Sequence, residues 1–297
     1  MPEDSKKAQG LLQDLEAIED SAIDRTEKSI MRGLQRLALN VITESEGFDT
    51  DDQGRLTQSP ANMAKTTDMI GQFDPALQQL GSLARTEASS SLVEMSDILD
   101  DIMTEVAPGV RIPVDPDVLG TMTNFNFSRF NNGASATSQV LSDMLFQSMS
   151  TRLNRAEFIE KIQATVVGEV DKRGNPLGRH AKTWATTALT QFEGDYVQSV
   201  TDVSLIGGWY YSGTLISTSR DFCASRVGRY FTDEEIREDI ANNPLGNSSM
   251  SLPGGWNCRH RLLPVGPERF NRKTNRGKGG TIDPEDSNRP DPPKEEE

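Results

Sequence analysis

Two cysteines and two histidines are the residues of this chain best suited to chemistry, and all of them lie between positions 180 and 260: His180, Cys223, Cys258 and His260. Thiolate sulfur and imidazole nitrogen are the ligands that zinc prefers, and two of each can fill a tetrahedral shell. Their spacing is not that of a zinc finger, because only Cys258 and His260 are close in sequence. On a strand these two side chains would point to the same face and could approach one ion. The pattern therefore favours a structural zinc site as one hypothesis.

Two other interpretations of these residues stay open. Cys223 and Cys258 can be neighbouring thiols, or a disulfide, without any metal. The residues can also be unrelated core or surface positions, because free cysteine is among the most buried residue types. A catalytic cysteine–histidine pair needs mutual hydrogen-bond reach, and we expect the side-chain tips on either side of Arg259 to be separated. We therefore predict no catalytic residue and no bound organic cofactor, with a structural zinc ion as the candidate cofactor.

Two acidic segments offer oxygen ligands but fit a metal poorly. Residues 49–60 imitate a calcium-binding loop, yet Pro60 stands where that loop needs a bidentate glutamate. The acidic residues between 233 and 239 follow Thr232, which with Glu235 forms the capping-box pattern of a helix start. We interpret the first segment as an acidic turn and the second as the solvated face of a helix.

Most of the chain is expected to be helical, because apolar residues recur at steps of three or four over long stretches. Ser59 is a suitable N-cap and Pro60 suits a first helical position. Pro75 is expected to end one helix and begin another. The predicted helices cover residues 11–41, 60–73, 75–83, 92–106, 140–149, 158–166 and 179–200.

The character of the sequence changes near residue 203. Residues 206–216 are aromatic and β-branched, with glycines between them, which predicts a β-hairpin or two short strands. The expected fold is therefore mainly α, with long amphipathic helices and a small C-terminal α+β module whose strands lie near 203–265.

Four regions follow from these patterns. Residues 1–106 form an N-terminal helical region, and the proline-containing segment 107–118 is a linker or extended arm. Residues 119–265 form the α+β module. Residues 266–297 lose apolar side chains and form a charged, proline-rich tail, expected to be flexible.

Composition excludes several classes of protein. The chain has 45 acidic and 31 basic residues and a formal charge of −14, so it does not attract a phosphate backbone non-specifically. A basic stretch at 269–278 is the exception. No run of about 18 apolar residues predicts a membrane span, and residues 1–7 lack the apolar core of a secretory signal. Two cysteines in a chain of this length fit a reducing compartment.

Short motifs follow one another in the C-terminal third. They are Arg179–Ala181 and Thr186–Ala188 on a predicted helix, then Gly208–Tyr211, Thr218–Cys223, Gly228–Thr232 and Gly255–Val265. This ordered series resembles the Mu F-like minor head, or head morphogenesis, proteins of tailed bacteriophages. The resemblance covers residues 120–265 and is strongest from 209 to 265, with a looser likeness in the first hundred residues. Cys223 stands where many members have histidine, and His260 where many have a second cysteine.

The resemblance implies a structural minor head protein and not an enzyme. Such a protein is located in the virion head or neck, and in the host cytoplasm during assembly, and is present in multiple copies. Its partners would be the portal and other head and neck proteins, with packaged DNA a further partner for residues 269–278. The alternative is a metal-dependent enzyme or nuclease-like factor that uses His180, Cys223, Cys258 and His260.

Overall fold

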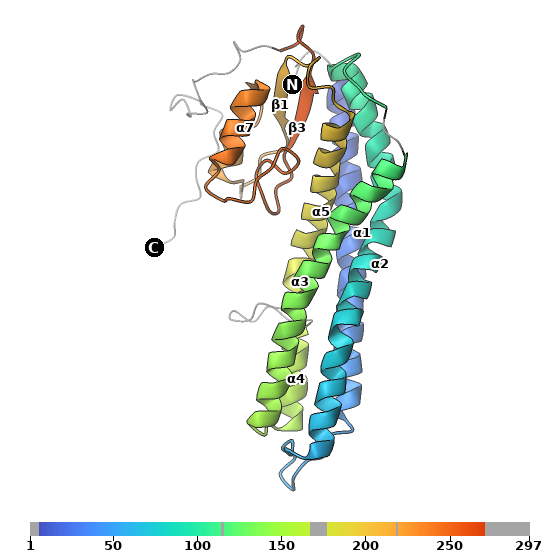
Figure 1. The fold of residues 1–297 in the computed structure, drawn as a ribbon, viewed down its shortest axis with the longest axis vertical. Helices are drawn as coiled ribbons and strands as arrows, with labels where there is room; N and C mark the ends of the chain where they lie inside the picture. The colour runs from blue at the N-terminus through green and yellow to red at the C-terminus, as the bar shows by residue number, and fades with distance from the viewer. Residues whose placement is uncertain (1–5, 114–115, 167–176, 218, 271–297) are drawn as a thin grey trace. The chain divides into compact units, whose positions relative to one another are not determined.

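The fold was analysed in a computed structural model, which describes residues 6–113, 116–166, 177–217 and 219–270 (Figure 1). These residues are mainly helical and include a small antiparallel sheet near the C-terminal end of the described chain. The expected fold class is therefore confirmed. Within the described residues, no helix is long and apolar enough to cross a membrane.

In the described part of the chain, five helices precede the sheet: α1 (Lys6–Ser45), α2 (Pro60–Val106), α3 (Pro116–Ser150), α4 (Arg155–Val166) and α5 (Leu177–Val200). The buried positions of α1 recur at helical spacing and include Leu15, Ile30 and Leu34. The predicted start of α2 is confirmed, since Ser59 Oγ accepts a hydrogen bond from the Asn62 N–H at 3.1 Å.

Helix α2 continues through Pro75, so the prediction of a new helix at this residue was wrong. The predicted helices 60–73, 75–83 and 92–106 are parts of one helix. An internal proline costs a helix about 3 kcal/mol, because it removes a hydrogen bond and its ring meets the carbonyl four residues earlier. Phe73, Leu77 and Leu80 are buried on both sides of Pro75. Burial of each such side chain contributes about 1.5–3 kcal/mol, which offsets the proline.

The sheet has the order β2-β1-β3, with β1 (Gly208–Ser212), β2 (Tyr230–Phe231) and β3 (Arg261–Val265) all antiparallel. The predicted hairpin at 206–216 is instead one central strand, and its partners come from later segments. The chain leaves β1 at Gly213, whose φ of +144° favours glycine, and continues into α6 (Asp221–Ala224). Pro264 is compatible with β3 because that strand lies at an edge.

Helix α7 (Asp233–Ala241) packs against β1 and β2 (Figure 1). Its predicted capping box is present: Thr232 Oγ1 accepts from the Glu235 N–H, and Glu235 Oε2 accepts from the Thr232 N–H. The Trp209 Nε1–H of β1 donates to Asp233 Oδ1 at 2.9 Å. A hydrogen bond from a buried tryptophan to the first residue of α7 therefore joins the sheet to this helix.

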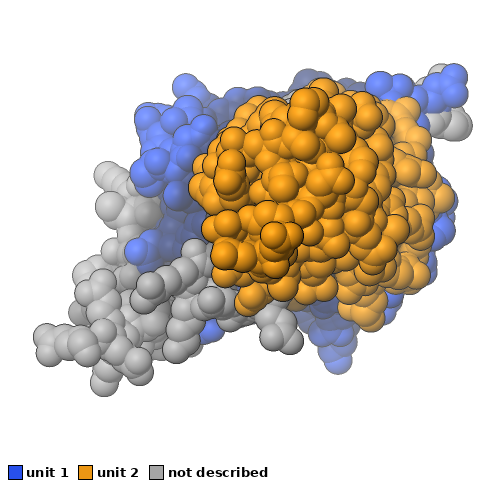
Figure 2. Space-filling model, turned by 90° about the horizontal axis from the view of Figure 1, so that it is seen from below, with its two compact units in different colours: residues 1–21, 90–123, 186–297 blue, residues 22–89, 124–185 orange. Residues whose placement is uncertain are grey.

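The described chain divides into two compact units (Figure 2). Unit 1 contains residues 1–21, 90–123 and 186–297, and unit 2 contains residues 22–89 and 124–185. Each unit contains residues from both the predicted N-terminal region, 1–106, and the predicted module, 119–265. The two units therefore differ from the regions predicted from the sequence. In unit 1, the Ile112 N–H donates to the Val200 carbonyl at 2.7 Å, so this part of the expected arm is held at the end of α5.

The start of the predicted tail is ordered by aromatic packing. Phe270 packs on a buried cluster of Tyr210, Tyr230 and Val265. The rest of the predicted tail, residues 271–297, lies outside the described residues, as do most of the basic residues of the 269–278 stretch.

Candidate metal centre

Unit 1 brings together three of the four residues singled out in the sequence. Cys223 lies on α6, while Cys258 and His260 lie in the segment that leads into β3. All three are buried, and one ligand atom from each lies within 4.8 Å of the others. His180 is not in this group. It lies on the part of α5 that belongs to unit 2, where its ring stacks on Trp184 with centroids 5.9 Å apart.

The three ligand atoms lie close together. The Cys223 and Cys258 Sγ atoms are 3.8 Å apart, and Cys258 Sγ is 3.4 Å from His260 Nδ1. Both cysteines are free, since a disulfide needs sulfurs about 2.0 Å apart. The expectation that the tips of Cys258 and His260 are separated was wrong. These residues precede β3, and the Cys258 Sγ also accepts from the His260 N–H at 3.4 Å.

Tyr211 completes the surroundings of the sulfurs. It lies on β1, is fully buried, and its hydroxyl donates to Cys223 Sγ at 3.4 Å. Its ring also lies against that of His260, with centroids 5.7 Å apart. The sequence placed Tyr211 in a strand and in a motif but did not identify it as a site residue. The alternation of side chains along a strand places Tyr211 and Trp209 on the same face, so a strand prediction that fixed the inward face would have found it.

The backbone approaches the two sulfurs at Gly254. A Cβ atom at this residue would lie 2.4 Å from Cys258 Sγ and 2.5 Å from Cys223 Sγ. Arg220 fixes the same loop, because its guanidinium donates to the carbonyls of Gly254 and Trp256. The absence of a side chain at residue 254 therefore allows the backbone to approach both thiols.

The electrostatics favour one thiolate in this pair of cysteines. The hydrogen bond from Cys258 lowers the pKa of Cys223 to about 4, and His260 acts in the same direction, while burial opposes both. The interaction with Cys223 in turn raises the pKa of Cys258. Burial raises the pKa of Tyr211, so its hydroxyl keeps its proton and donates it to sulfur. One negative charge is thus shared by two soft ligands beside an imidazole.

Gly254→Ala should lower the free energy of unfolding by about 1–3 kcal/mol, because the new methyl group overpacks both sulfurs. Gly10→Ala is the matched control: a Cβ there meets nothing within 4 Å, and alanine in a helix should be neutral or stabilising by up to about 1 kcal/mol. Urea denaturation of both variants measures the difference. Equal stability of the two variants would contradict the close approach at Gly254.

A second buried cluster in unit 1 was missed by the sequence reasoning. Glu19 of α1, Glu193 of α5 and Arg261 of β3 are almost completely buried. Arg261 Nη2 donates to Glu19 Oε2 at 2.9 Å, and Arg261 Nε lies 3.1 Å from Glu193 Oε2 in an ion pair without hydrogen-bond geometry. Glu19 also accepts from the Thr190 hydroxyl at 3.0 Å. Arg259 adds a longer contact to Glu19 at 3.4 Å.

The sequence did carry a signal for this cluster. Glu19 lies four residues after Leu15, on the apolar stripe of α1, and Glu193 lies four residues from both Leu189 and Val197. A carboxylate that lies on the same helix face as an apolar stripe is buried with it. A buried carboxylate needs a cation nearby. Arg261 supplies that cation from a strand that is distant in sequence.

Glu193 should make stability depend on pH. Burial raises its pKa well above 4.5, more than Arg261 lowers it, so the folded state holds the proton more tightly than the unfolded state does. Stability from this residue is then present below about pH 4.5 and is lost as the pH rises toward the raised pKa. The difference in unfolding free energy between wild type and Glu193→Gln should fall with pH in that window, by up to about 1.4 kcal/mol per pH unit. A difference independent of pH would contradict this assignment.

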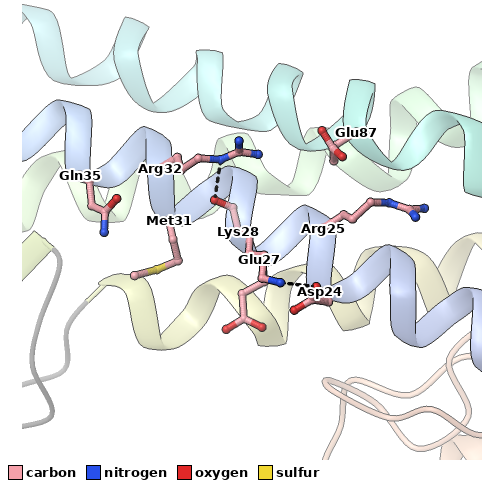
Figure 3. Close-up of a pocket in the computed structure, with 8 residues that line it drawn as sticks. All are labelled: Asp24, Arg25, Glu27, Lys28, Met31, Arg32, Gln35 and Glu87. Atoms are coloured by element: carbon pink, nitrogen blue, oxygen red, sulfur yellow. Dashed lines mark hydrogen bonds and ion pairs between the residues drawn. The ribbon is translucent and has the colours of Figure 1, made fainter.

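A groove of about 530 Å³ runs along α1 in unit 2 and is the other candidate site (Figure 3). It is lined by Asp24, Arg25, Glu27, Lys28, Met31, Arg32, Gln35 and Glu87. None of these side chains is buried, and acidic and basic groups are equally represented. Lys28 Nζ pairs with Asp24 Oδ2 at 2.7 Å, as the dashed line in Figure 3 shows. Charges of both signs on exposed and half-buried side chains do not select a ligand of one charge.

The cysteine–histidine cluster is therefore the site with the clearer chemistry. Its groups can hold a soft metal ion, and His260 and Cys258 also have the mutual reach of a nucleophilic pair. Their ligand atoms are enclosed, with no residue of the three more than 6% exposed, which disfavours access by a substrate. No family model, curated protein or solved structure matches the chain.

Proposed function

We propose that this chain is a structural minor head protein of a tailed bacteriophage, which associates with the portal or inner head and assists head assembly or genome delivery. The observation that supports the proposal is that the motifs of the C-terminal third contact one another. The Asn257 N–H donates to Thr187 Oγ1 at 3.0 Å, and Trp209 pairs with Phe231 across two strands. The motifs from Thr186 onward thus lie in one compact unit, whereas the first, Arg179–Ala181, belongs to the other.

A structural role also agrees with the chemistry of the site. The thiols and the imidazole are buried, so they are suited to stabilising the fold and poorly placed to react with a substrate. The long helices carry exposed apolar side chains, among them Leu39, Val93 and Val140. Helical surfaces of this kind are suited to docking on partner proteins.

Mass spectrometry of purified, DNA-filled particles tests the proposal. The particles come from a host strain that carries the gene, and we expect the chain in more than one copy per particle. Deletion of the gene should lower the yield of infectious particles, and the wild-type gene supplied in trans should restore it. Absence of the chain from filled particles would reject the proposal.

The alternative function is a metal-dependent enzyme or nuclease-like factor, and one observation favours it: the 3.4 Å contact between Cys258 Sγ and His260 Nδ1. This function predicts turnover of DNA or peptide substrates that Cys258→Ser abolishes. Screening the full chain on both substrate classes, with His180→Ala as a matched variant outside the cluster, separates the two functions.

A further inference from the structure

We propose that Cys223, Cys258 and His260 bind one Zn²⁺ ion per chain, through the two Sγ atoms and Nδ1. The proposal goes beyond the proposed function, since the site would exist whether or not the chain is a virion component. It also reduces the ligand set expected from the sequence, because His180 is not a member of the group.

The distances between the ligand atoms match the edges of a tetrahedral zinc shell. Zinc–sulfur bonds of about 2.3 Å and zinc–nitrogen bonds of about 2.0–2.1 Å give a sulfur–sulfur edge of about 3.8 Å and a sulfur–nitrogen edge of about 3.5 Å. The observed separations are 3.8 Å between the two sulfurs and 3.4 Å between Cys258 Sγ and His260 Nδ1. Two of the three edges therefore match a zinc shell, and the third, between Cys223 and His260, lies within 4.8 Å.

The protein satisfies these three groups poorly without an ion. His260 is 6% exposed, and its Nε2 has no hydrogen-bond partner in the described part of the chain. Its Nδ1 faces sulfur, a weak hydrogen-bonding partner. A metal bond at Nδ1 would replace this weak contact with a strong one. Two thiolates and an imidazole select zinc over magnesium or calcium, which prefer oxygen ligands.

The surroundings hold the ligands in place. Gly254 lets the backbone approach both sulfurs, and a Cβ at Gly213 would lie 2.7 Å from the His260 ring. Tyr211 is a positioning residue, because its hydroxyl donates to Cys223 Sγ and orients that ligand. Arg220 anchors the Gly254 loop through two carbonyls. The site thus has closely packed ligand side chains and an outer hydrogen bond of the kind that metal centres use.

Metal analysis of the purified full chain tests the proposal. The protein is isolated without a metal-affinity tag, zinc is measured by plasma mass spectrometry, and thiol accessibility is titrated before and after chelation. We expect one zinc per chain, with both thiols protected until the ion is removed. Absence of zinc, before and after reconstitution with ZnCl₂, would overturn the proposal, as would a Cys223–Cys258 disulfide in protein isolated under reducing, anaerobic conditions.

Variants assign the ligands. Cys223→Ser, Cys258→Ser and His260→Asn should each lose stoichiometric zinc, whereas His180→Ala should retain it. Tyr211→Phe should keep one zinc per chain but bind it about 10–100-fold more weakly, as expected for an outer-shell partner. Retention of zinc by both cysteine variants, or its loss in His180→Ala, would contradict the ligand set.

Cobalt substitution of the wild type keeps the test valid if a cysteine variant does not fold. Co²⁺ added to the zinc-free full chain should produce a near-ultraviolet thiolate-to-cobalt charge-transfer band and the visible bands of tetrahedral cobalt. One equivalent of Zn²⁺ should remove both. A spectrum without the thiolate band would overturn coordination by Cys223 and Cys258.

Discussion

Arg261→Met should lower the free energy of unfolding by about 3–5 kcal/mol, because it removes the main cation of a buried ion cluster and leaves Glu19 with only the longer ion-pair contact to Arg259. Arg261 is 2% exposed and Glu19 and Glu193 are fully buried. Methionine keeps an apolar stem in place of the aliphatic part of arginine, so loss of the guanidinium charge and of its hydrogen bonds should dominate the effect. Urea denaturation at neutral pH, followed by circular dichroism, measures it.

The loss should shrink in acid. With Arg261 removed, Glu193 loses the cation that lowers its pKa, so this carboxyl becomes easier to protonate. Protonation removes the charges that the variant cannot compensate, so the difference between wild type and Arg261→Met should be smaller near pH 4.5 than at pH 7. A difference that grows in acid would contradict the proposed role of the two carboxylates.

Two further variants separate charge from packing. Lys28→Met removes an exposed ion pair with Asp24 and should cost less than about 1 kcal/mol. The double variant Glu193→Gln/Arg261→Met should recover part of the loss, because it contains one fewer unpaired buried charge. Failure of the second substitution to recover any stability would show that Glu193 does not interact with Arg261.

The helical part of the fold was predictable because it depends on local pattern. The apolar spacing of residues 11–41 and the caps at Ser59 and Thr232 are local signals, and the structure has the expected helix or helix start at each. Pro75 shows the limit of such reasoning. Its local preference is to break a helix, and burial of Phe73 and Leu77 overrides that preference.

The sheet and the sites could be predicted only in part, because their partners are distant in sequence. Residues 206–216 have strand composition, but composition does not say that β1 pairs with 230–231 and 261–265. In the same way, Cys223 and Cys258 could be identified as candidates from residue type. Tyr211 could be identified only once the strand and its inward face were known. The Glu19–Arg261 contact joins α1 to β3, and no short motif includes both.

Residues 258–261, which lead into β3 and begin it, contribute side chains to both clusters of unit 1. Cys258 and His260 turn toward the sulfur cluster, while Arg259 and Arg261 reach Glu19. Alternation of side chains along an extended segment explains how adjacent residues face two environments. A backbone shift at these residues should therefore disturb the thiols and the ion cluster together.

Trp209→Ala should be as destabilising as the loss of Arg261, at about 3–5 kcal/mol, because it leaves a large cavity beneath the central strand. Trp209 is fully buried and pairs with Phe231 on one side and Pro264 on the other. Trp209→Phe retains most of the ring and should cost about 1–2 kcal/mol, since it removes the bond to Asp233. Trp256→Ala, at an exposed tryptophan, should change stability by less than about 1 kcal/mol.

Amide hydrogen exchange distinguishes the two large effects. Because β1 lies between both other strands, Trp209→Ala should raise exchange in β2 and in β3. Arg261→Met removes a contact between β3 and α1, so it should raise exchange in β3 and around Glu19 while β2 stays protected. If Trp209→Ala loosened only β2, the central position of β1 would not determine the stability of the sheet. Uniform loss of protection in both variants would instead mean that unit 1 opens as one cooperative body, with the sheet and the ion cluster contributing to a single transition.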